Sequence, residues 1–207
     1  MISKETEVLI EKIKNDMKTE LSQKRYEHCL GVMNKAVELA KIYNISEDDA
    51  ALAGLTHDIA KEIPPSEALK IAEENGIEFD EIEKANTALL HGKIGSYIAQ
   101  TRYNLSKEIQ DAIKYHTTTD KKMDMLAKII YVSDKVEEGR KSDKYDITSE
   151  RELAKTDIDA TVIYILNENI TSLIARKKLI HPKGIETRNF LMMHGGCKWY
   201  LKTIIKY

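Results

Sequence analysis

The stretch Gly54-Leu55-Thr56-His57-Asp58-Ile59-Ala60-Lys61 places an imidazole and a carboxylate side by side within a run of small and apolar residues. Both side chains are metal-ligand types, so the pair indicates a metal site. On a helix, Lys61 follows His57 by four residues and Asp58 by three, which puts its ammonium on the face that the two ligands address. A phosphate bound to the metal would meet that ammonium. A His-Asp pair alone is more often a chance occurrence, so the rest of the chain has to decide.

Composition limits the class of protein. A chain of 207 residues is long enough for one sizeable domain and does not require two. Its 32 Lys+Arg against 34 Asp+Glu give a formal net charge of -2, so neither a nucleic acid nor a membrane is expected as a partner. No apolar run approaches the ~20 residues that a membrane span needs. Cys29 and Cys197 lack CxxC spacing, which argues against a thiolate zinc site. We expect a cytoplasmic protein.

Apolar periodicity and capping residues predict an all-α chain. The pattern predicts an opening helix over residues 4–19 and a second helix capped by Ser22. Ser46, followed by three acidic residues, predicts the start of a third helix that carries the His-Asp pair. Further starts are predicted at Ser66, Asp80, Ser106 and Asp124.

The last third of the chain is predicted to be helical at first and less regular later. Residues 149–179 read as one or two long helices, which His181-Pro182 ends. The tail from Gly184 to Tyr207, with Trp199 and Tyr200, is expected to be an irregular covering segment.

Four of the six histidines and two aspartates fall on inward helix faces or at helix ends. These candidate metal ligands are His28, His57, Asp58, His91, His116 and Asp134. Dispersed nitrogen and oxygen ligands suit a buried site assembled from several helices, and no zinc-finger or EF-hand spacing is present. Six ligands are more than one catalytic metal usually takes, so two metals fit better, with Asp58 bridging ions ~3.5–4 Å apart. Imidazole with carboxylate favours iron or manganese, with zinc as an alternative.

The order of these six residues resembles that of the HD-domain metal-dependent phosphohydrolases, and the two extra histidines resemble its dinuclear branch. More closely, five motifs are similar to those of the YqeK family. They are Arg25-Tyr26-Glu27-His28, His57-Asp58-Ile59-Ala60-Lys61, Leu90-His91-Gly92, Tyr115-His116-Thr117-Thr118 and Ile129-Ile130-Tyr131-Val132-Ser133-Asp134. The resemblance covers about residues 20–180. It implies a single HD-domain helical bundle there, preceded by an N-terminal helix (1–19) and followed by a C-terminal covering segment (181–207).

The resemblance also implies an activity, the symmetrical hydrolysis of diadenosine tetraphosphate to two ADP. One metal would be held by His28, His57, Asp58 and Asp134, and the second by Asp58, His91 and His116. Lys61 and Arg140, together with Arg25 and Thr117, would contact phosphate oxygens, because a polyanionic substrate needs fixed cations near the attacked phosphorus. Asp58, Lys61 and Arg140 are the expected catalytic residues. In this hypothesis a metal-bound hydroxide attacks an inner phosphorus, and Lys61 with Arg140 stabilises the departing nucleoside diphosphate.

Two departures from the family pattern affect this hypothesis. Thr119 stands where the family usually has glycine, and Ser133 where alanine is common, so the loop near His116 is expected to differ in shape. Arg140 and Lys135 could equally be surface charges after a helix.

Other functions stay open at this point. One is a different HD phosphohydrolase, such as a 5'-nucleotidase or a guanosine tetraphosphate hydrolase. The other is a non-catalytic regulatory module that binds a nucleotide. The sequence leaves a homodimer open.

Overall fold

Helices α2 (Gln23–Ile42) and α3 (Glu47–Thr56) pack closely against each other and carry the first part of the site. Small residues of α3 permit the approach: a Cβ on Gly54 would lie 2.8 Å from the Cα of Met33.

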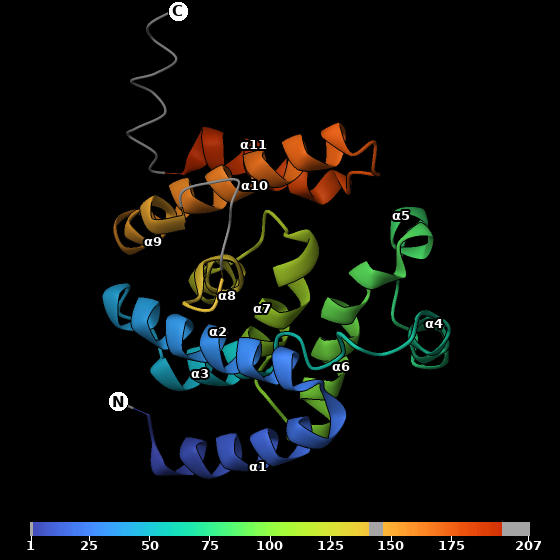
Figure 1. Ribbon diagram of the computed structural model, residues 1–207, viewed down its shortest axis with the longest axis vertical. Helices are drawn as coiled ribbons and strands as arrows, with labels where there is room; N and C mark the ends of the chain where they lie inside the picture. The colour runs from blue at the N-terminus through green and yellow to red at the C-terminus, as the bar shows by residue number, and fades with distance from the viewer. Residues whose placement is uncertain (1, 141–146, 196–207) are drawn as a thin grey trace, which may run out of the picture.

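The computed structural model describes residues 2–140 and 147–195, and these ranges contain eleven α-helices, one 3-10 helix and no strand (Figure 1). The all-α prediction is thus confirmed for the described residues. The remaining helices are α1 (Lys4–Glu20), α4 (Pro65–Glu74), α5 (Glu81–Ala85), the 3-10 helix Thr87–Leu89, α6 (His91–Tyr103), α7 (Lys107–Thr118), α8 (Met125–Val136), α9 (Ile147–Thr156), α10 (Ile158–Ala175) and α11 (Pro182–His194).

Most helix starts agree with the predicted caps. The side chains of Ser22, Ser46, Ser106 and Asp124 each accept a hydrogen bond from a backbone N–H of the first turn that follows. Asp80 and Glu83 form a capping box at the start of α5. Only α4 begins one residue early, with Pro65 in place of Ser66 as its first residue.

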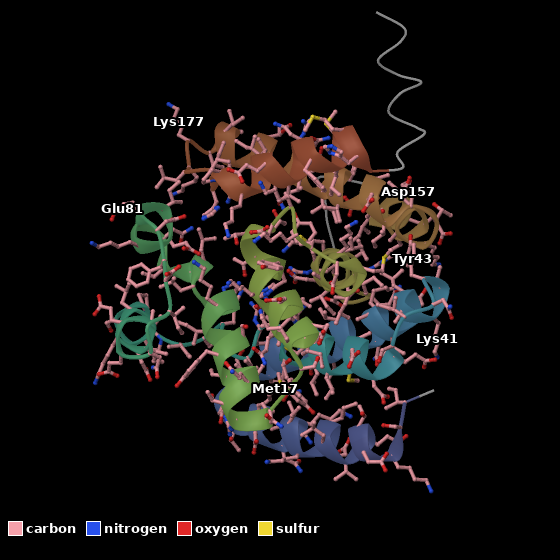
Figure 2. The ribbon with its side chains drawn as sticks, turned by 180° about the vertical axis from the view of Figure 1, so that it is seen from behind. Met17, Lys41, Tyr43, Glu81, Asp157 and Lys177 are labelled. Carbon is pink, nitrogen blue, oxygen red and sulfur yellow. The ribbon has the colours of Figure 1, made fainter. Side chains whose placement is uncertain are left out.

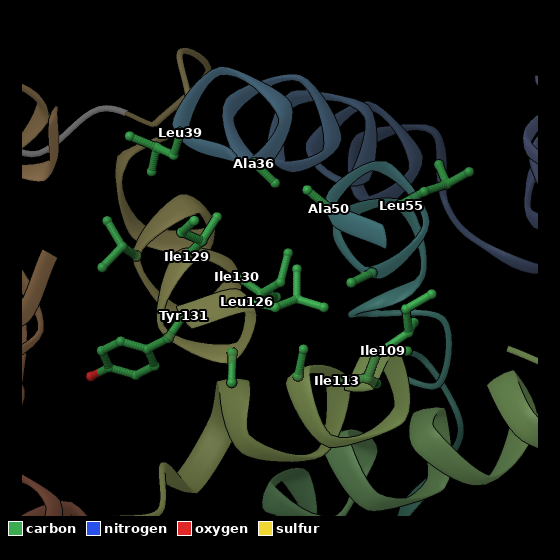
Figure 3. Packing of buried hydrophobic residues seen from close by; sticks show 14 of the residues in the cluster. Ala36, Leu39, Ala50, Leu55, Ile109, Ile113, Leu126, Ile129, Ile130 and Tyr131 are labelled. Atoms are coloured by element: carbon green, nitrogen blue, oxygen red, sulfur yellow. The ribbon is translucent and has the colours of Figure 1, made fainter. Parts of the chain in front are cut away.

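Helix α8 lies in the middle of the bundle, against α2, α7 and α10. Figure 3 shows side chains of α8 between α2, α3 and α7, with Ile129 and Ile130 facing Ala36 of α2 and Ala50 of α3. Helix α1 covers the α3 side, and α9 to α11 cover the opposite side (Figure 1). The hydroxyl of Tyr43, at the end of α2, donates to the carbonyl of Ala154, 2.8 Å away, and so ties α2 to α9 (Figure 2). None of the described helices combines the length and apolarity needed to cross a bilayer.

Two expectations were wrong. Helix α3 ends at Thr56, so His57 and Asp58 lie in the hydrogen-bonded turns that follow it and not on the helix itself. Residues 184–194, expected to belong to an irregular segment, lie in α11, which begins at Pro182, where the missing N–H of proline is not needed, and packs against α10. Trp199 and Tyr200 lie outside the described residues.

Candidate metal centre

The six predicted ligands come from five different elements and converge on one place. His28 lies on α2, His91 begins α6, His116 is in the last turn of α7 and Asp134 is on α8. His57 and Asp58 directly follow α3. The six side chains thus come together from helices α2, α6, α7 and α8 and from the turn after α3.

The ligand atoms form two groups that share Asp58. Nitrogen and oxygen atoms of His28, His57 and Asp58 lie within 4.8 Å of one another, as do those of Asp58, His91 and His116. Asp134 joins the first group, because its Oδ1 lies 3.0 Å from Nε2 of His28 and 3.7 Å from Nε2 of His57. The two groups coincide with the ligand sets that the family resemblance implies.

Hydrogen bonds fix the same tautomer in three of the histidines. Nδ1 donates to the carbonyl of Gly54 in His57, of Ala88 in His91 and of Ile113 in His116. A carbonyl can only accept, so Nδ1 carries the proton and Nε2 of the neutral ring is left with its lone pair. In its neutral form each ring therefore presents a lone pair to the centre.

These lone pairs meet other acceptor atoms. Nε2 of His91 lies 3.0 Å from Nε2 of His116 and 3.0 Å from Oδ1 of Asp58. Nε2 of His57 and Oδ1 of Asp58 are buried and find no hydrogen-bond partner among residues 2–140 and 147–195. Buried acceptors that face one another repel unless a cation lies between them. The donor set therefore fits metal ions, and imidazole with carboxylate is the chemistry of iron, manganese or zinc.

The charges around the two carboxylates keep them ionised. Burial alone would favour the neutral acid, but His57 and the other ring neighbours hold the pKa of Asp58 well below its usual range. Burial also opposes ionisation of Asp134, but the charge of Lys135 and, after it, the hydrogen bond with His28 keep the pKa of this carboxyl well below its usual range. Burial lowers the pKa of His116 to about 4, so this ring is neutral at neutral pH. The ionised carboxylates and the neutral imidazole both favour binding of a cation.

Four cationic side chains surround the ligand carboxylates. Arg25 Nη1 lies 2.6 Å from Asp58 Oδ2, and Lys61 Nζ lies 3.8 Å from Asp58 Oδ1. Arg140 Nη2 lies 2.8 Å from Asp134 Oδ1, and Lys135 Nζ lies 2.5 Å from Asp134 Oδ2. Arg25, Lys61 and Arg140 were singled out from the sequence as phosphate contacts, and the structure brings all three to the centre.

The end of α7 adds Thr117 to the centre. Its Oγ1 lies 3.2 Å from Nε2 of His91 and 3.3 Å from Nε2 of His116. Two residues later, Thr119 has a φ of +61°, a conformation that favours glycine. Thr119 thus adopts a conformation that glycine tolerates best, and its buried hydroxyl bonds to Thr118 O and Thr187 Oγ1.

Two hollows reach the centre, one at each of the two groups of ligands. One, of about 390 Å³, is lined by Lys61 and His91 together with Ala60, Ala68 and Thr87. The other, of about 380 Å³, is lined by Arg25, His28 and Arg140 among others. Each hollow therefore reaches one ligand histidine and at least one cation.

Sequence reasoning missed Glu137 and left Lys135 open as a surface charge. Glu137 is buried, and its Oε1 lies 3.2 Å from Nδ1 of His28. Glu137 directly follows α8 and comes three residues after Asp134, so the helical spacing that placed Asp134 on the inward face could have found it.

A third cluster, made of Asp80, Glu83 and His181, lies outside this centre. Nδ1 of His181 accepts the backbone N–H of Lys183, so the proton is on Nε2, which lies 2.9 Å from Asp80 Oδ2. Lys93 already pairs with Glu83 at 2.6 Å. A protonated ring nitrogen cannot ligate a metal. The contacts therefore link the start of α5 to the start of α11 and do not form a metal site.

Comparisons with known proteins agree with this geometry. The HD domain family matches residues 25–139. The symmetrical bis(5'-nucleosyl)-tetraphosphatase of Halalkalibacterium halodurans is 32% identical over 178 residues, which are 86% of this chain and 94% of that protein. The enzyme of the same name from Bacillus subtilis is 32% identical over 177 residues, 85% of this chain and 94% of that protein.

A solved structure is also similar. It is a predicted HD superfamily hydrolase involved in NAD metabolism from Clostridium acetobutylicum, with a TM-score of 0.85 and 34% identity. The match covers 88% of this chain and 96% of that one. The chain therefore belongs to the HD-domain family and, within it, to the YqeK type of symmetrical bis(5'-nucleosyl)-tetraphosphatases.

Proposed function

We propose that this protein hydrolyses dinucleoside tetraphosphates, diadenosine tetraphosphate among them, symmetrically into two nucleoside diphosphates. The observation that carries the proposal is the sharing of Asp58 between two groups of ligand histidines. Two metals that share a carboxylate can clamp the attacking and the leaving oxygen of one phosphate displacement. The relatives that the chain matches over most of their length carry the name of this activity.

Six residues would hold the two metals. His28, His57, Asp58 and Asp134 would bind one ion, and Asp58, His91 and His116 the other. When bound, the metals would lower the pKa of a water and neutralise charge on the phosphate under attack. Among the candidate metals we favour iron, because four imidazoles and two carboxylates suit it, with manganese and zinc as alternatives.

The cations of the centre would bind the polyphosphate. Lys61 lies beside Asp58, the carboxylate that both groups share, and Arg140 lies beside Asp134. Each can therefore offer N–H donors to a phosphate oxygen at its own end of the centre. Arg25 and the hydroxyl of Thr117 would add further donors. These groups hold and orient the substrate and stabilise charge on the departing diphosphate.

The hollows on the two sides of the centre support a substrate with two ends. A dinucleoside tetraphosphate carries a nucleoside at each end and its phosphates in the middle. The hollow beside Lys61 and His91 would take one nucleoside, and the hollow beside Arg25 and Arg140 the other. The apolar walls of the first hollow, such as Ala60 and Ala68, suit a nucleobase, whereas the second is lined by polar and charged side chains that suit the phosphates and ribose next to it.

Product analysis tests the proposal. Purified, metal-analysed protein is incubated with diadenosine tetraphosphate, and the nucleotides are resolved by ion-exchange chromatography. ADP as the sole product supports the proposal, whereas AMP with ATP would keep a hydrolase but move the attacked phosphorus. Tight binding without any product would point to a regulatory module, and parallel incubations with a nucleoside monophosphate and guanosine tetraphosphate test the other phosphohydrolases.

A further inference from the structure

We infer that Glu137 is a positioning residue that sets the orientation and basicity of His28, and thereby the affinity of one of the two metal sites. The inference rests on the proposed function, in which His28 is a metal ligand. Glu137 ends α8, is only 4% exposed, and places Oε1 3.2 Å from Nδ1 of His28. Nε2 of the same ring points to the centre, 3.0 Å from Asp134 Oδ1.

His28 is held differently from the other three ligand histidines. His57, His91 and His116 each donate Nδ1–H to a backbone carbonyl three residues earlier in the chain. Those acceptors are neutral and belong to the local turn. The partner of His28 is a carboxylate 109 residues away in sequence. An anionic acceptor makes the opposite ring nitrogen a stronger ligand than a neutral carbonyl does, so the two metal sites are supported unequally.

The surroundings of the Glu137 carboxylate are shaped to hold it. A Cβ on Gly31, one turn along α2 from His28, would come within 2.6 Å of Glu137 Oε2. A Cβ on Gly139 would come within 2.9 Å of the same oxygen, and the backbone N–H of Gly139 donates to it. Two glycines thus clear the space that the carboxylate occupies.

The backbone at Glu137 is fixed as well. Arg151, from α9, donates Nη2–H to the carbonyl of Glu137 at 2.7 Å and Nε–H to that of Val136 at 2.8 Å. Within the described residues, the carboxylate of Glu137 makes its ion pair with the ring of His28 and not with a lysine or an arginine. A buried carboxylate held in this way is placed to accept the Nδ1–H of His28 and to fix the orientation of that ring.

Titration of metal-free protein with Mn²⁺, followed by the electron paramagnetic resonance signal of unbound Mn²⁺, tests the inference. Wild type is expected to bind two ions per chain. In Glu137→Ala one of the two sites should weaken about 10–100-fold, the usual effect of losing the partner of a ligand histidine. Glu137→Gln should weaken the same site less, because its amide oxygen can still accept the Nδ1–H bond. The other site should keep its affinity in both variants.

Glu138→Ala is the matched control. Glu138 is the adjacent acidic residue, but its side chain is 73% exposed and pairs with Lys35 and Arg151, so its loss should leave both Mn²⁺ affinities unchanged. Gly31→Ala, which pushes a methyl group into the carboxylate, should weaken the same site as Glu137→Ala. Circular dichroism confirms folding, and Glu137→Gln decides the question if Glu137→Ala unfolds.

Unchanged affinity at both sites in folded Glu137→Gln and Gly31→Ala would overturn the inference, as would an equal loss at both sites. Failure of the proposed function gives a different result. A wild-type protein that binds two Mn²⁺ but releases no ADP from diadenosine tetraphosphate would disprove the activity and leave the effect of Glu137 on one site intact. A wild-type protein that binds no metal would overturn both.

Discussion

The Nζ atom of Lys61 lies 3.8 Å from Oδ1 of Asp58, the carboxylate that both ligand groups share. The same ammonium lies 3.2 Å from Nε2 of His91. Burial lowers the pKa of Lys61, and Asp58 counteracts this effect by favouring the charged form. A cation beside the shared ligand can act on a bound phosphate without being a ligand itself, so the two side chains should be separable by mutation.

Replacing Asp58 and Lys61 by alanine should give different defects. Asp58→Ala should lose bound metal and turnover together, because both groups lose a ligand. Lys61→Ala should keep its metal and lose about 10²–10³-fold in kcat, the usual effect of removing one donor to the transition state. Metal analysis and kinetics on the same preparations measure this. Lys70→Ala, on the exposed face of α4, is the control and should match wild type. Full activity in a metal-replete Asp58→Ala protein would refute the assignment.

Removing metal should destabilise the fold. The centre gathers buried acceptors from α2, α6, α7 and α8, and metal bound only by the folded chain stabilises it by about 2.7 kcal/mol at a hundredfold excess over Kd. Chelation should therefore lower the thermal midpoint, and added Mn²⁺ should restore it. The midpoint of Asp58→Ala should respond much less to either treatment. Equal metal responses in the two proteins would place the stabilising ion elsewhere.

The contact between α2 and α3 should not tolerate a methyl group at Gly54. A Cβ there would lie 2.8 Å from backbone Cα of Met33, so Gly54→Ala has to push the helices apart and should cost about 1–3 kcal/mol. At Gly184, in α11, the single neighbour that a Cβ would meet in the described part of the chain is Leu166 Cδ2, at 3.7 Å. Gly184→Ala should accordingly stabilise by about 0.5–1 kcal/mol. Urea denaturation measures both, and effects of the same sign would contradict the packing argument.

Thr119 should prefer glycine to alanine as a substitute. Thr119→Ala keeps a side chain at a φ of +61° and loses the hydroxyl contacts with Thr118 and Thr187, so we expect a loss of about 1 kcal/mol. Thr119→Gly loses the same contacts but relieves about 1–3 kcal/mol of backbone strain, because a φ of +61° with a ψ of 172° is a region that mainly glycine adopts. Denaturant unfolding should therefore find Thr119→Gly the more stable of the two. The opposite order would mean that the positive φ of Thr119 is not strained.

Metal binding should depend on pH through His57 but not through His116. Burial opposes charge on His57, yet Asp58 and Asp134 together raise its pKa, so in metal-free protein a proton competes with the ion. Affinity at the group that contains His57 should rise with pH until that pKa is passed. Because the pKa of His116 is about 4, this ring loses no proton when metal binds at neutral pH. Calorimetry at about pH 6 and about pH 8, in buffers of different ionisation enthalpy, counts the protons released. Equal proton release at both sites would contradict this.

The sequence by itself determined the helical class, most helix starts and the identity of the six candidate ligands. Helix caps such as Ser22 and Asp124 act within one turn, and the inward positions of His28 and His116 follow from periodicity along a single helix. Both signals are local, so they can be seen before the chain folds.

Only the tertiary structure decided how these residues meet. Glu137 reaches His28 across 109 residues, and Arg25 reaches Asp58 across 33. The turn at His57, which replaced the expected helix, and α11 also depend on what packs against them. Contacts between distant segments are fixed by the close packing of α2, α3 and α8, which no local periodicity encodes.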